Sequence, residues 1–393
     1  MRLVNLRDTT VLHFGWLCLA AGLTLSLLGI YAIDLGSHAG DSEMAARTMS
    51  PLAFKQLVFL AVGLLAAAMA AAPDSKFLRM ISWPSLAVSI GLLVLLLLPF
   101  VPAWLVTPRN GVRGWIDLGA FDLQPVELAK IAFVLASAEY LRHRTNHRTL
   151  LGLLPPAFIT FVPVSLIYLQ PDLGAALLFI PAIFAILVAS GARLKHMAMV
   201  VLIGFMAAPI SYPLLHEYQK QRIIGLIQQF RGVHSGADDI NYQAYTAQTV
   251  AGSGGLSGYN DAKARAIVKY ASLPERHNDM IFAVILSRFG FIGGMVVIGL
   301  YMLWLLGAML TAAICKEPFG RLVVVGLSMF MAVTAAVNMA MVLGMLPIVG
   351  LTLPFVSYGG SSMVSVWITT GLIFGIAMRR APRLVRPAFE FND

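Results

Sequence analysis

The sequence predicts an all-α protein that crosses a membrane about ten times, with both termini in the cytoplasm and a large outer loop between spans seven and eight. The first observation behind this prediction is composition. Of 393 residues, 59% are hydrophobic and only 12% are charged, and the mean hydropathy is +0.80. The second is length, because many apolar runs reach the roughly 20 residues that a bilayer core requires. The third is a regular alternation of positive charge between the runs.

The apolar runs locate the helices in order along the chain. The first run is too long, and too little like a cleavable signal, to be removed, so it is interpreted as a true span. We interpret residues 1–393 as one integral-membrane domain with outer loops at about 101–124 and 216–279. The expected helices lie near 12–34, 53–72, 78–100, 125–142, 151–169, 173–191, 196–215, 280–312, 319–343 and 362–379.

Basic side chains follow every second span, which is the pattern of cytoplasmic loops. The net charge of +9 therefore has a topological explanation, and no basic stretch interleaved with aromatic residues points to nucleic acid. The two cysteines are too few for a disulfide framework or a metal site. The basic residues are Arg2, Arg7, Lys76, Arg79, Arg142, Arg144, Arg148, Arg193, Lys195, Lys316, Arg321, Arg379, Arg380, Arg383 and Arg386.

The outer connections hold the unusual residues. A Gly cluster at 251–258, which includes Ser253, lets the backbone approach another group closely, although a flexible loop is the simpler interpretation. The stretch 344–362 is dense in Gly, Pro and Ser, and irregular backbone of this kind is tolerated in a membrane protein only when it is shielded from lipid. It is either a re-entrant structural turn or a cavity lining that presents the hydroxyls of Ser357, Tyr358 and Ser361. A further amphipathic segment, 218–230, is expected to lie as a helix in the interface.

A polar cluster, 273–279, runs directly into the apolar run at 280 and places the carboxylate of Asp279 at the mouth of a membrane helix. Charge is costly there and commonly functional. A helix N-cap, worth about 1 kcal/mol, is the structural alternative. A cap needs only one such residue, however, and His277 and Asn278 are also in the cluster. Desolvation at a cavity mouth would raise the carboxyl pKa towards that of a useful general base.

Other charged residues have the same two interpretations. Asp172 opens the sixth helix and is either a cap or a site residue. Glu127 and Lys130 are three residues apart at the start of the fourth helix and form either an in-helix pair or part of a site. Arg109 and Arg113, in the first outer loop, are suited to clamp an anionic lipid head group such as a pyrophosphate, or are solvated.

Six motifs in this order resemble the RodA/FtsW/SpoVE family of polytopic cell-wall proteins, the SEDS family, over essentially the whole chain. The matching residues are Asn110-Gly111 with Trp115-Ile116, Gln124-Pro125 with Glu127 and Lys130, Gln170-Pro-Asp-Leu-Gly174, Tyr242-Gln243 with Gly252-Ser-Gly-Gly255, the run from Leu273 to Ala283, and Leu353 to Ser362. The Gln170–Gly174 motif favours the elongation branch of the family, RodA, over the division branch, FtsW.

The resemblance implies a glycosyltransferase that polymerises lipid II, the lipid-linked peptidoglycan precursor. It would act on the outer face of the bacterial cytoplasmic membrane, beside a class B penicillin-binding protein. The family's catalytic acid falls on Asp279, and its functional loop tryptophan falls on Trp115. Inversion at an α-linked pyrophosphate donor needs one general base. It also needs countercharge on the leaving group, for which Arg109 and Arg113 are the candidates.

The prediction also covers cofactors, metals and the residues that would contact the substrate. No cofactor is evident and no metal ligand is named, while a divalent cation is left open. The residues assigned to substrate binding are Arg109, Arg113, Trp115, Glu127, Lys130, Asp172, Ser253, His277, Ser357, Tyr358 and Ser361.

The chain departs from the family pattern at a few positions. Ser287 and Arg288 stand where the family commonly has two acids, Val126 stands where it usually has Ser, and Thr246 where it often has Gln. Arg288 lies well inside a span and therefore needs an anionic partner, which the sequence does not identify. Two alternatives to the enzyme are a flippase for the lipid-linked precursor and a non-catalytic scaffold for the penicillin-binding protein.

Overall fold

A computed structural model of the chain describes residues 13–38, 49–102, 104–106, 108, 112–119, 121–211, 213, 220–221, 224–225, 227 and 242–379. Arg109 and most of the expected interface helix at 218–230 therefore lie outside the described residues. The prediction that 1–393 forms one domain stays a prediction.

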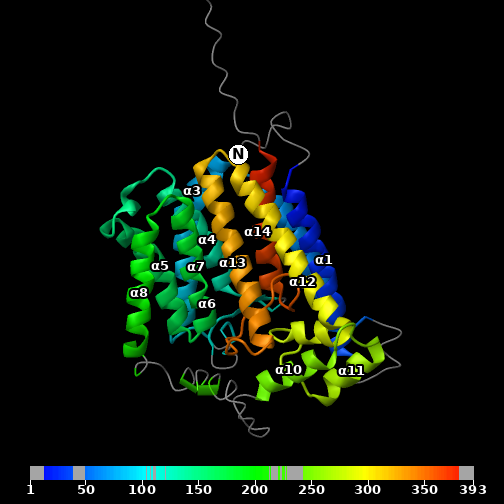
Figure 1. Cartoon of the computed structure of the whole chain (residues 1–393). Coiled ribbons are helices and arrows are strands. Elements are labelled where there is room, and N and C mark those ends of the chain that lie inside the picture. Colours follow the sequence, from blue (N-terminus) through cyan, green and yellow to red (C-terminus); the bar gives the residue numbers. More distant parts are fainter. Residues whose placement is uncertain are drawn as a thin grey trace, which may run out of the picture.

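The molecule is a bundle of helices that run along a common direction (Figure 1). All ten expected helices are present. The described helices are α1 (Gly15–Ser37), α2 (Pro51–Ala71), α3 (Ser75–Leu97), α4 (Pro125–Leu141), α5 (Leu154–Leu169), α6 (Leu173–Leu177), α7 (Phe179–Ala189), α8 (Leu194–Ser211), α10 (Tyr242–Ser253), α11 (Asp261–Tyr270), α12 (Ile281–Ile314), α13 (Pro318–Val342) and α14 (Gly360–Met378). Short 3-10 turns at Asn146–Arg148 and Leu151–Leu153 join α4 to α5.

Seven of the described helices are long and apolar enough to cross a membrane. They are α1, α2, α3, α5 with its preceding turn, α12, α13 and α14. Two shorter apolar segments, Leu173–Ala189 and Leu194–Gly204, and the 17-residue α4 complete the expected set. The chain is therefore a multi-span, all-helical membrane protein, as the sequence predicts.

The two ends of the described chain lie at the same end of the bundle. The ring of His13, just before α1, contacts the ring of Phe374 in α14 with 4.5 Å between centroids. The ten expected crossings are an even number, and an even number of crossings places both ends of a chain on the same side of the membrane. Helices α10 and α11 lie at the opposite end (Figure 1). A small antiparallel hairpin, β1 (Ile116–Asp117) with β2 (Asp122–Leu123), belongs to the first outer loop.

Local sequence explains where several helices begin. The Ser50 hydroxyl accepts a hydrogen bond from Ala53 N (3.2 Å) at the start of α2, and Asp74 accepts one from Phe77 N (2.8 Å) at the start of α3. Asn260 caps α11 in the same way. These side chains satisfy backbone donors that the first turn of a helix leaves unpaired.

The predicted single helix 173–191 is in fact two helices, α6 and α7. The interruption at Leu178 lies just before Pro181. Proline has no N–H, so Pro181 cannot donate to the carbonyl of Leu177 and the regular ladder is lost there.

The predicted single helix 280–312 is also wrong in one respect, because α12 is interrupted at Gly290 (φ 65°). The segment 255–259 pairs with the interrupted backbone. Phe291 N donates to Gly255 O (2.8 Å), Ile292 N donates to Leu256 O (3.1 Å), and Tyr259 N donates to Ser287 O (3.3 Å). At membrane depth, these groups would otherwise be unpaired at a cost of several kcal/mol each.

The same contacts correct the interpretation of the Gly cluster as a flexible loop. A Cβ on Gly254 would overlap the carbonyl oxygen of Leu286, and one on Gly258 would overlap that of Arg288. The glycines are needed because two backbones meet at the break in α12. Ser253, within this cluster, donates its hydroxyl to Val250 O (2.7 Å) in its own helix.

We expect Gly254→Ala to lower the melting temperature of the purified protein by several degrees, because its methyl group would push segment 254–258 away from α12. Gly252→Ala is the matched control. Nothing lies within 4 Å of a Cβ at Gly252, which is in α10, so alanine there should be neutral or stabilising by about 0.5–1 kcal/mol. Thermal unfolding in detergent measures both variants. Equal melting temperatures for the two would contradict the close-approach explanation.

Candidate functional site

The connection between α13 and α14 folds back into the bundle. Leu353, Phe355 and Val356 are each no more than 2% exposed, and Ser357 is 4% exposed. Phe355 has a left-handed backbone (φ 67°) and its ring packs against Trp304 and Trp367. A non-glycine residue keeps such a conformation only when its surroundings dictate it. The re-entrant interpretation of this stretch therefore agrees with the structure.

The re-entrant segment holds the peptide backbone that leads to Asp279. Three consecutive carbonyls, those of His277, Asn278 and Asp279, each accept a hydrogen bond from the re-entrant segment or from α13. Their donors are Tyr358 N (2.8 Å), Ser357 Oγ (2.7 Å) and Asn338 Nδ2 (2.9 Å), respectively. The segment before α12 is thus fixed residue by residue to α13 and to the re-entrant connection.

The Asp279 side chain is partly buried and faces Gly350. Its Oδ2 atom lies 3.7 Å from the position that a Cβ on Gly350 would occupy, and Gly350 has a φ of 74°. Met280, rather than Asp279, is at the N-cap position of α12, and it provides no side-chain cap. Because helix boundaries vary by one or two residues between definitions, the cap and the functional role of Asp279 both stay predictions.

Glu127 and Lys130 form an ion pair inside the bundle, with Lys130 Nζ 2.6 Å from Glu127 Oε1. Their side chains are only 10% and 14% exposed. The pair lies beside a small cavity between α4, α13 and α14, and the in-helix spacing thus produces a buried pair rather than a solvated one. The polar residues that also line the cavity are Thr334, Thr352, Ser362, Ser365 and Thr369.

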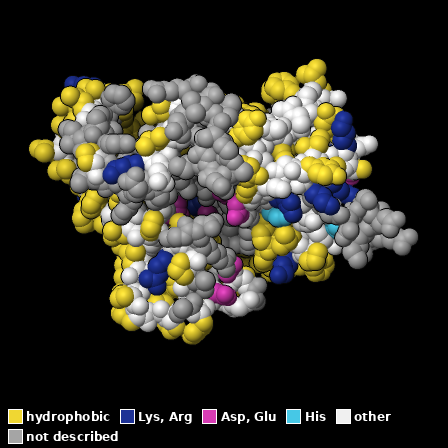
Figure 2. Space-filling view, turned by 90° about the horizontal axis from the view of Figure 1, so that it is seen from below, with side chains coloured by type: hydrophobic (Ala, Val, Ile, Leu, Met, Phe, Trp, Pro, Cys, Tyr) yellow, Lys and Arg dark blue, Asp and Glu magenta, His cyan; other side chains and the backbone are white. Residues whose placement is uncertain are grey.

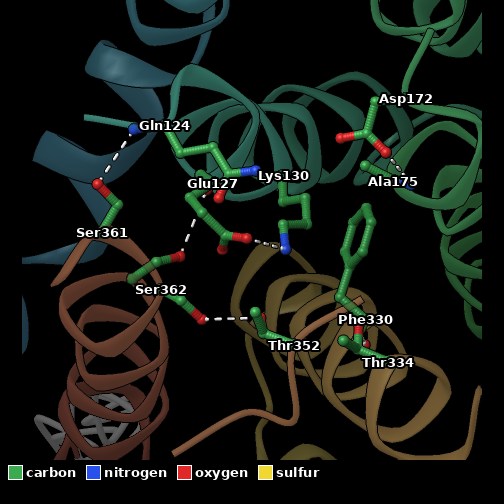
Figure 3. A network of polar contacts seen from close by, with 11 residues as sticks. Gln124, Glu127, Lys130, Asp172, Ala175, Phe330, Thr334, Thr352, Ser361 and Ser362 are labelled. Atoms are coloured by element: carbon green, nitrogen blue, oxygen red, sulfur yellow. Dashed lines mark hydrogen bonds and ion pairs between the residues drawn. The ribbon is translucent and has the colours of Figure 1, made fainter. Parts of the chain in front are cut away.

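The close view in Figure 3 shows Lys130 turned towards Glu127, and the Ser362 hydroxyl next to that of Thr352 (3.4 Å). Thr352 lies two residues after Gly350, which faces Asp279. The re-entrant connection therefore contributes both to the cavity wall and to the surroundings of the Asp279 carboxylate.

Ser361 and Gln56 attach neighbouring segments to the same connection. The Ser361 hydroxyl donates to Asp122 O and accepts from Gln124 N (3.0 Å), which joins the start of α14 to the first outer loop (Figure 3). Gln56, fully buried in α2, donates to Ser357 O (3.0 Å) and accepts from Gly359 N (3.2 Å). Tyr358 is half-buried, its ring tilted against Phe59.

The remaining predicted binding residues are arranged as follows. Asp172 accepts a hydrogen bond from Ala175 N (3.0 Å) and so caps α6. Arg113 and Trp115 are partly buried in the first outer loop, and the Arg113 Nε is buried without a hydrogen-bond partner among the described residues. A substrate contact by any of these, or by Ser253, stays a prediction.

Among the candidate site residues, His277 has a clearly lowered pKa. Burial, together with the neighbouring Arg276, lowers the pKa of its imidazole from 6.5 to about 4. The ring lies against the end of α1, 3.3 Å from the position of a Cβ on Gly36. His277 is therefore neutral at physiological pH, and in that state it can accept as well as donate a hydrogen bond.

We expect the stability of the protein to fall as the pH is lowered from about 6.5 to about 4. In this window the unfolded chain protonates His277 while the folded protein does not, so acid favours unfolding. His277→Gln should make the melting temperature less dependent on pH across this range. Thermal melts at several pH values measure this dependence. If the melting temperature of His277→Gln changes with pH as steeply as that of the wild type, His277 is protonated in the folded protein as it is in the unfolded chain.

Arg288 has the anionic partner that its place in a span requires. Its Nε lies 2.6 Å from Asp261 Oδ1, in α11, and 2.9 Å from the Tyr31 hydroxyl, in α1. Its Nη1 donates to Tyr259 O (2.9 Å), and Tyr31 in turn donates to Asp261 (2.8 Å). The positive charge of Arg288 is therefore balanced within this chain, close to the break in α12.

Sequence reasoning missed several of these residues. Gln56, near the start of α2, and Asn338, near the end of α13, are fully buried amides within apolar spans, where a polar side chain signals a function or a specific contact. That signal was available in the sequence. Asp261 gave no comparable signal, because an acid at the start of an outer helix is ordinary.

Figure 2 shows the molecule from the end that carries the outer loops, with acidic side chains near the middle of this face and basic ones distributed around it. The fold and the site thus define a multi-span membrane protein with a polar site at its loop-bearing end, built from α12, α13 and the re-entrant connection.

Comparison with known proteins identifies the family. Residues 13–381 match the FtsW/RodA/SpoVE family model, described as a cell cycle protein. The chain belongs to this family. It is 33% identical over 347 residues to a probable peptidoglycan glycosyltransferase FtsW of Trichlorobacter lovleyi, covering 86% of this chain and 88% of the relative.

Two further similarities agree with this membership. The chain is 33% identical over 273 residues to the peptidoglycan glycosyltransferase MrdB of Escherichia coli, covering 69% of this chain and 72% of the relative. It also resembles, with a TM-score of 0.76 and 28% identity, a chain solved in a peptidoglycan synthase complex that coordinates polymerization and crosslinking, covering 92% of this chain and 97% of that one. The comparisons do not separate the RodA branch from the FtsW branch, because the chain is similar both to this FtsW and to the RodA of Thermus thermophilus, with 28% identity and a TM-score of 0.65, covering 92% of this chain and 96% of that one.

Proposed function

We propose that this peptidoglycan glycosyltransferase polymerises lipid II into glycan strands on the outer face of the bacterial cytoplasmic membrane, with Asp279 as the general base. The activity is that of its relatives in the FtsW/RodA/SpoVE family. The observation that carries the assignment of Asp279 is the way its segment is held. Its own carbonyl accepts a hydrogen bond from Asn338 in α13, both preceding carbonyls accept from the re-entrant connection, and its carboxylate faces Gly350.

The chemistry needs one base. The acceptor hydroxyl of one sugar attacks the anomeric carbon of the donor from the face opposite the pyrophosphate, and a β-1,4 bond forms as the carbon–oxygen bond to the pyrophosphate breaks. The hydroxyl proton passes to Asp279, and the lipid pyrophosphate leaves with the electron pair. A pyrophosphate is a good leaving group, so the second carboxylic acid that a glycosidase uses is not required.

The other site residues supply binding and countercharge in this proposal. Arg113, with Arg109, neutralises the departing pyrophosphate, which suits the fork of a guanidinium. Trp115 stacks against a sugar or the polyprenyl chain. Glu127 and Lys130 supply polar groups to the cavity behind the re-entrant connection. The partner is a class B penicillin-binding protein, supported by the similarity to a chain of a synthase complex that combines polymerization with crosslinking.

Purified wild-type protein, alone and with its class B penicillin-binding protein, should convert lipid II into glycan strands that a gel resolves by length. The same preparation in sealed vesicles should not move lipid II across the bilayer. Translocation without polymer would favour the flippase alternative, and neither activity in the presence of the partner would favour the scaffold. The scaffold alternative draws on Ser287 and Arg288 standing where the family commonly has acids, and the ion pair with Asp261 balances the charge of Arg288.

A further inference from the structure

We propose that Asn338 is a positioning residue for the Asp279 carboxylate. This rests on the proposed role of Asp279 as the general base. Asn338 is in α13, more than a turn before that helix ends at Val342, and its side chain is completely buried. Nothing in its sequence surroundings, a run of apolar residues, requires an amide at this position.

The amide of Asn338 joins the Asp279 peptide and the Leu351 peptide to the same point of α13. Its Nδ2 donates to Asp279 O (2.9 Å) and to Leu351 O (2.6 Å). Asp279 is the residue that carries the carboxylate, and Leu351 directly follows Gly350, which that carboxylate faces. One NH₂ group therefore sets the distance between the base and the wall opposite it.

The location in α13 makes this a rigid reference point. A helix held on several sides by the bundle moves less than a connection does, so a hydrogen bond from α13 fixes a loop residue to the frame of the molecule. The hydrogen bonds from Ser357 Oγ and Tyr358 N hold the two preceding carbonyls, but both donors are themselves in the re-entrant connection. Asn338 is the donor in this set that comes from a spanning helix.

A general base must stay within hydrogen-bond reach of the proton it removes. A displacement of about 1 Å can reduce a catalytic rate by as much as about 10²-fold. Without the Asn338 donors, the Asp279 and Leu351 carbonyls lose their shared hydrogen-bond donor in α13, and the carboxylate shifts relative to the bound sugar. Substrate binding, which uses other residues, should change little.

The test compares Asn338→Leu with the wild type in the polymerisation assay with the penicillin-binding protein present. Leucine has a similar size and no donor. We expect kcat to fall by about 10- to 10²-fold, while the KM and the binding of lipid II change by less than about 3-fold. Ser328→Ala is the control, because Ser328 is another fully buried polar residue of α13 and is not among the residues that line the cavity. It should leave kcat unchanged.

Asn338→Ala serves as a second variant if leucine is not accommodated. A folded variant with normal kcat would overturn the proposal, and so would a parallel loss of lipid II binding and melting temperature in both variants, since that would assign Asn338 to folding alone. The proposal on Asp279 fails separately. If Asp279→Asn polymerises normally, the base assignment is wrong, whereas an inactive Asp279→Asn beside a fully active Asn338→Leu overturns only the role of Asn338.

Discussion

Asp279→Asn is expected to reduce glycan polymerisation by about 10²–10⁴-fold, the usual contribution of a general base. The amide has nearly the shape of the carboxylate but cannot take a proton from the acceptor hydroxyl. The hydrogen bond from Asn338 to the Asp279 carbonyl does not involve the side chain, so the segment should keep its place. Lipid II binding and the melting temperature should therefore remain near the wild-type values.

The matched control for this variant is Asp117→Asn, which removes another carboxylate from the loop-bearing end. Asp117 Oδ1 accepts a hydrogen bond from Gly119 N (2.7 Å), and the Asn side-chain oxygen can accept the same bond. Full activity in Asp117→Asn, measured in the same gel assay, would show that loss of a negative charge at this end is not itself harmful. Strands of normal length and amount from Asp279→Asn would exclude Asp279 as the base.

The fold could be predicted largely from the sequence because its determinants are local. Apolar length, basic connections and capping residues such as Asp74 are each visible within a few positions. The break in α12 could not be predicted in this way. A lone glycine in an apolar run is compatible with a continuous helix, and Gly290 marks a break only because the segment 255–259 supplies the missing backbone partners.

In the candidate site, too, local features could be predicted from the sequence and tertiary contacts could not. The residues of the re-entrant connection and Asp279 could be selected from the sequence because Gly, Pro and charge are unusual next to apolar spans. Their relation to one another could not, since it depends on tertiary contacts. Asn338 is 59 residues from Asp279 in sequence and provides its backbone with a hydrogen-bond donor. No pattern along the chain encodes that pairing.

The second large expected effect concerns Arg288. Arg288→Glu should lower both the melting temperature and polymerisation, because it places a second carboxylate against Asp261 and removes the donors to Tyr31 and to the Tyr259 carbonyl. The two side chains are 27% and 41% exposed, so the ion pair alone is worth only about 1 kcal/mol. Loss of the hydrogen bonds next to the break in α12 should add roughly 1–3 kcal/mol.

The charge-exchanged protein, Asp261→Arg with Arg288→Glu, separates these contributions. It restores opposite charges between α11 and α12, so it should recover part of the stability and activity lost in Arg288→Glu, whereas Asp261→Arg alone should be impaired because two arginines then face each other. Thermal melts and the gel assay on all four proteins give the coupling energy, expected at about 0.5–3 kcal/mol for groups in contact.

If Arg288→Glu instead raised polymerisation from an inactive wild type, Arg288 would be a substitution that disables the enzyme, and the scaffold alternative would be correct. The balanced charge around Arg288 argues for the opposite result, because a residue with three hydrogen-bond partners and a countercharge is an integrated part of the structure that supports Asp279.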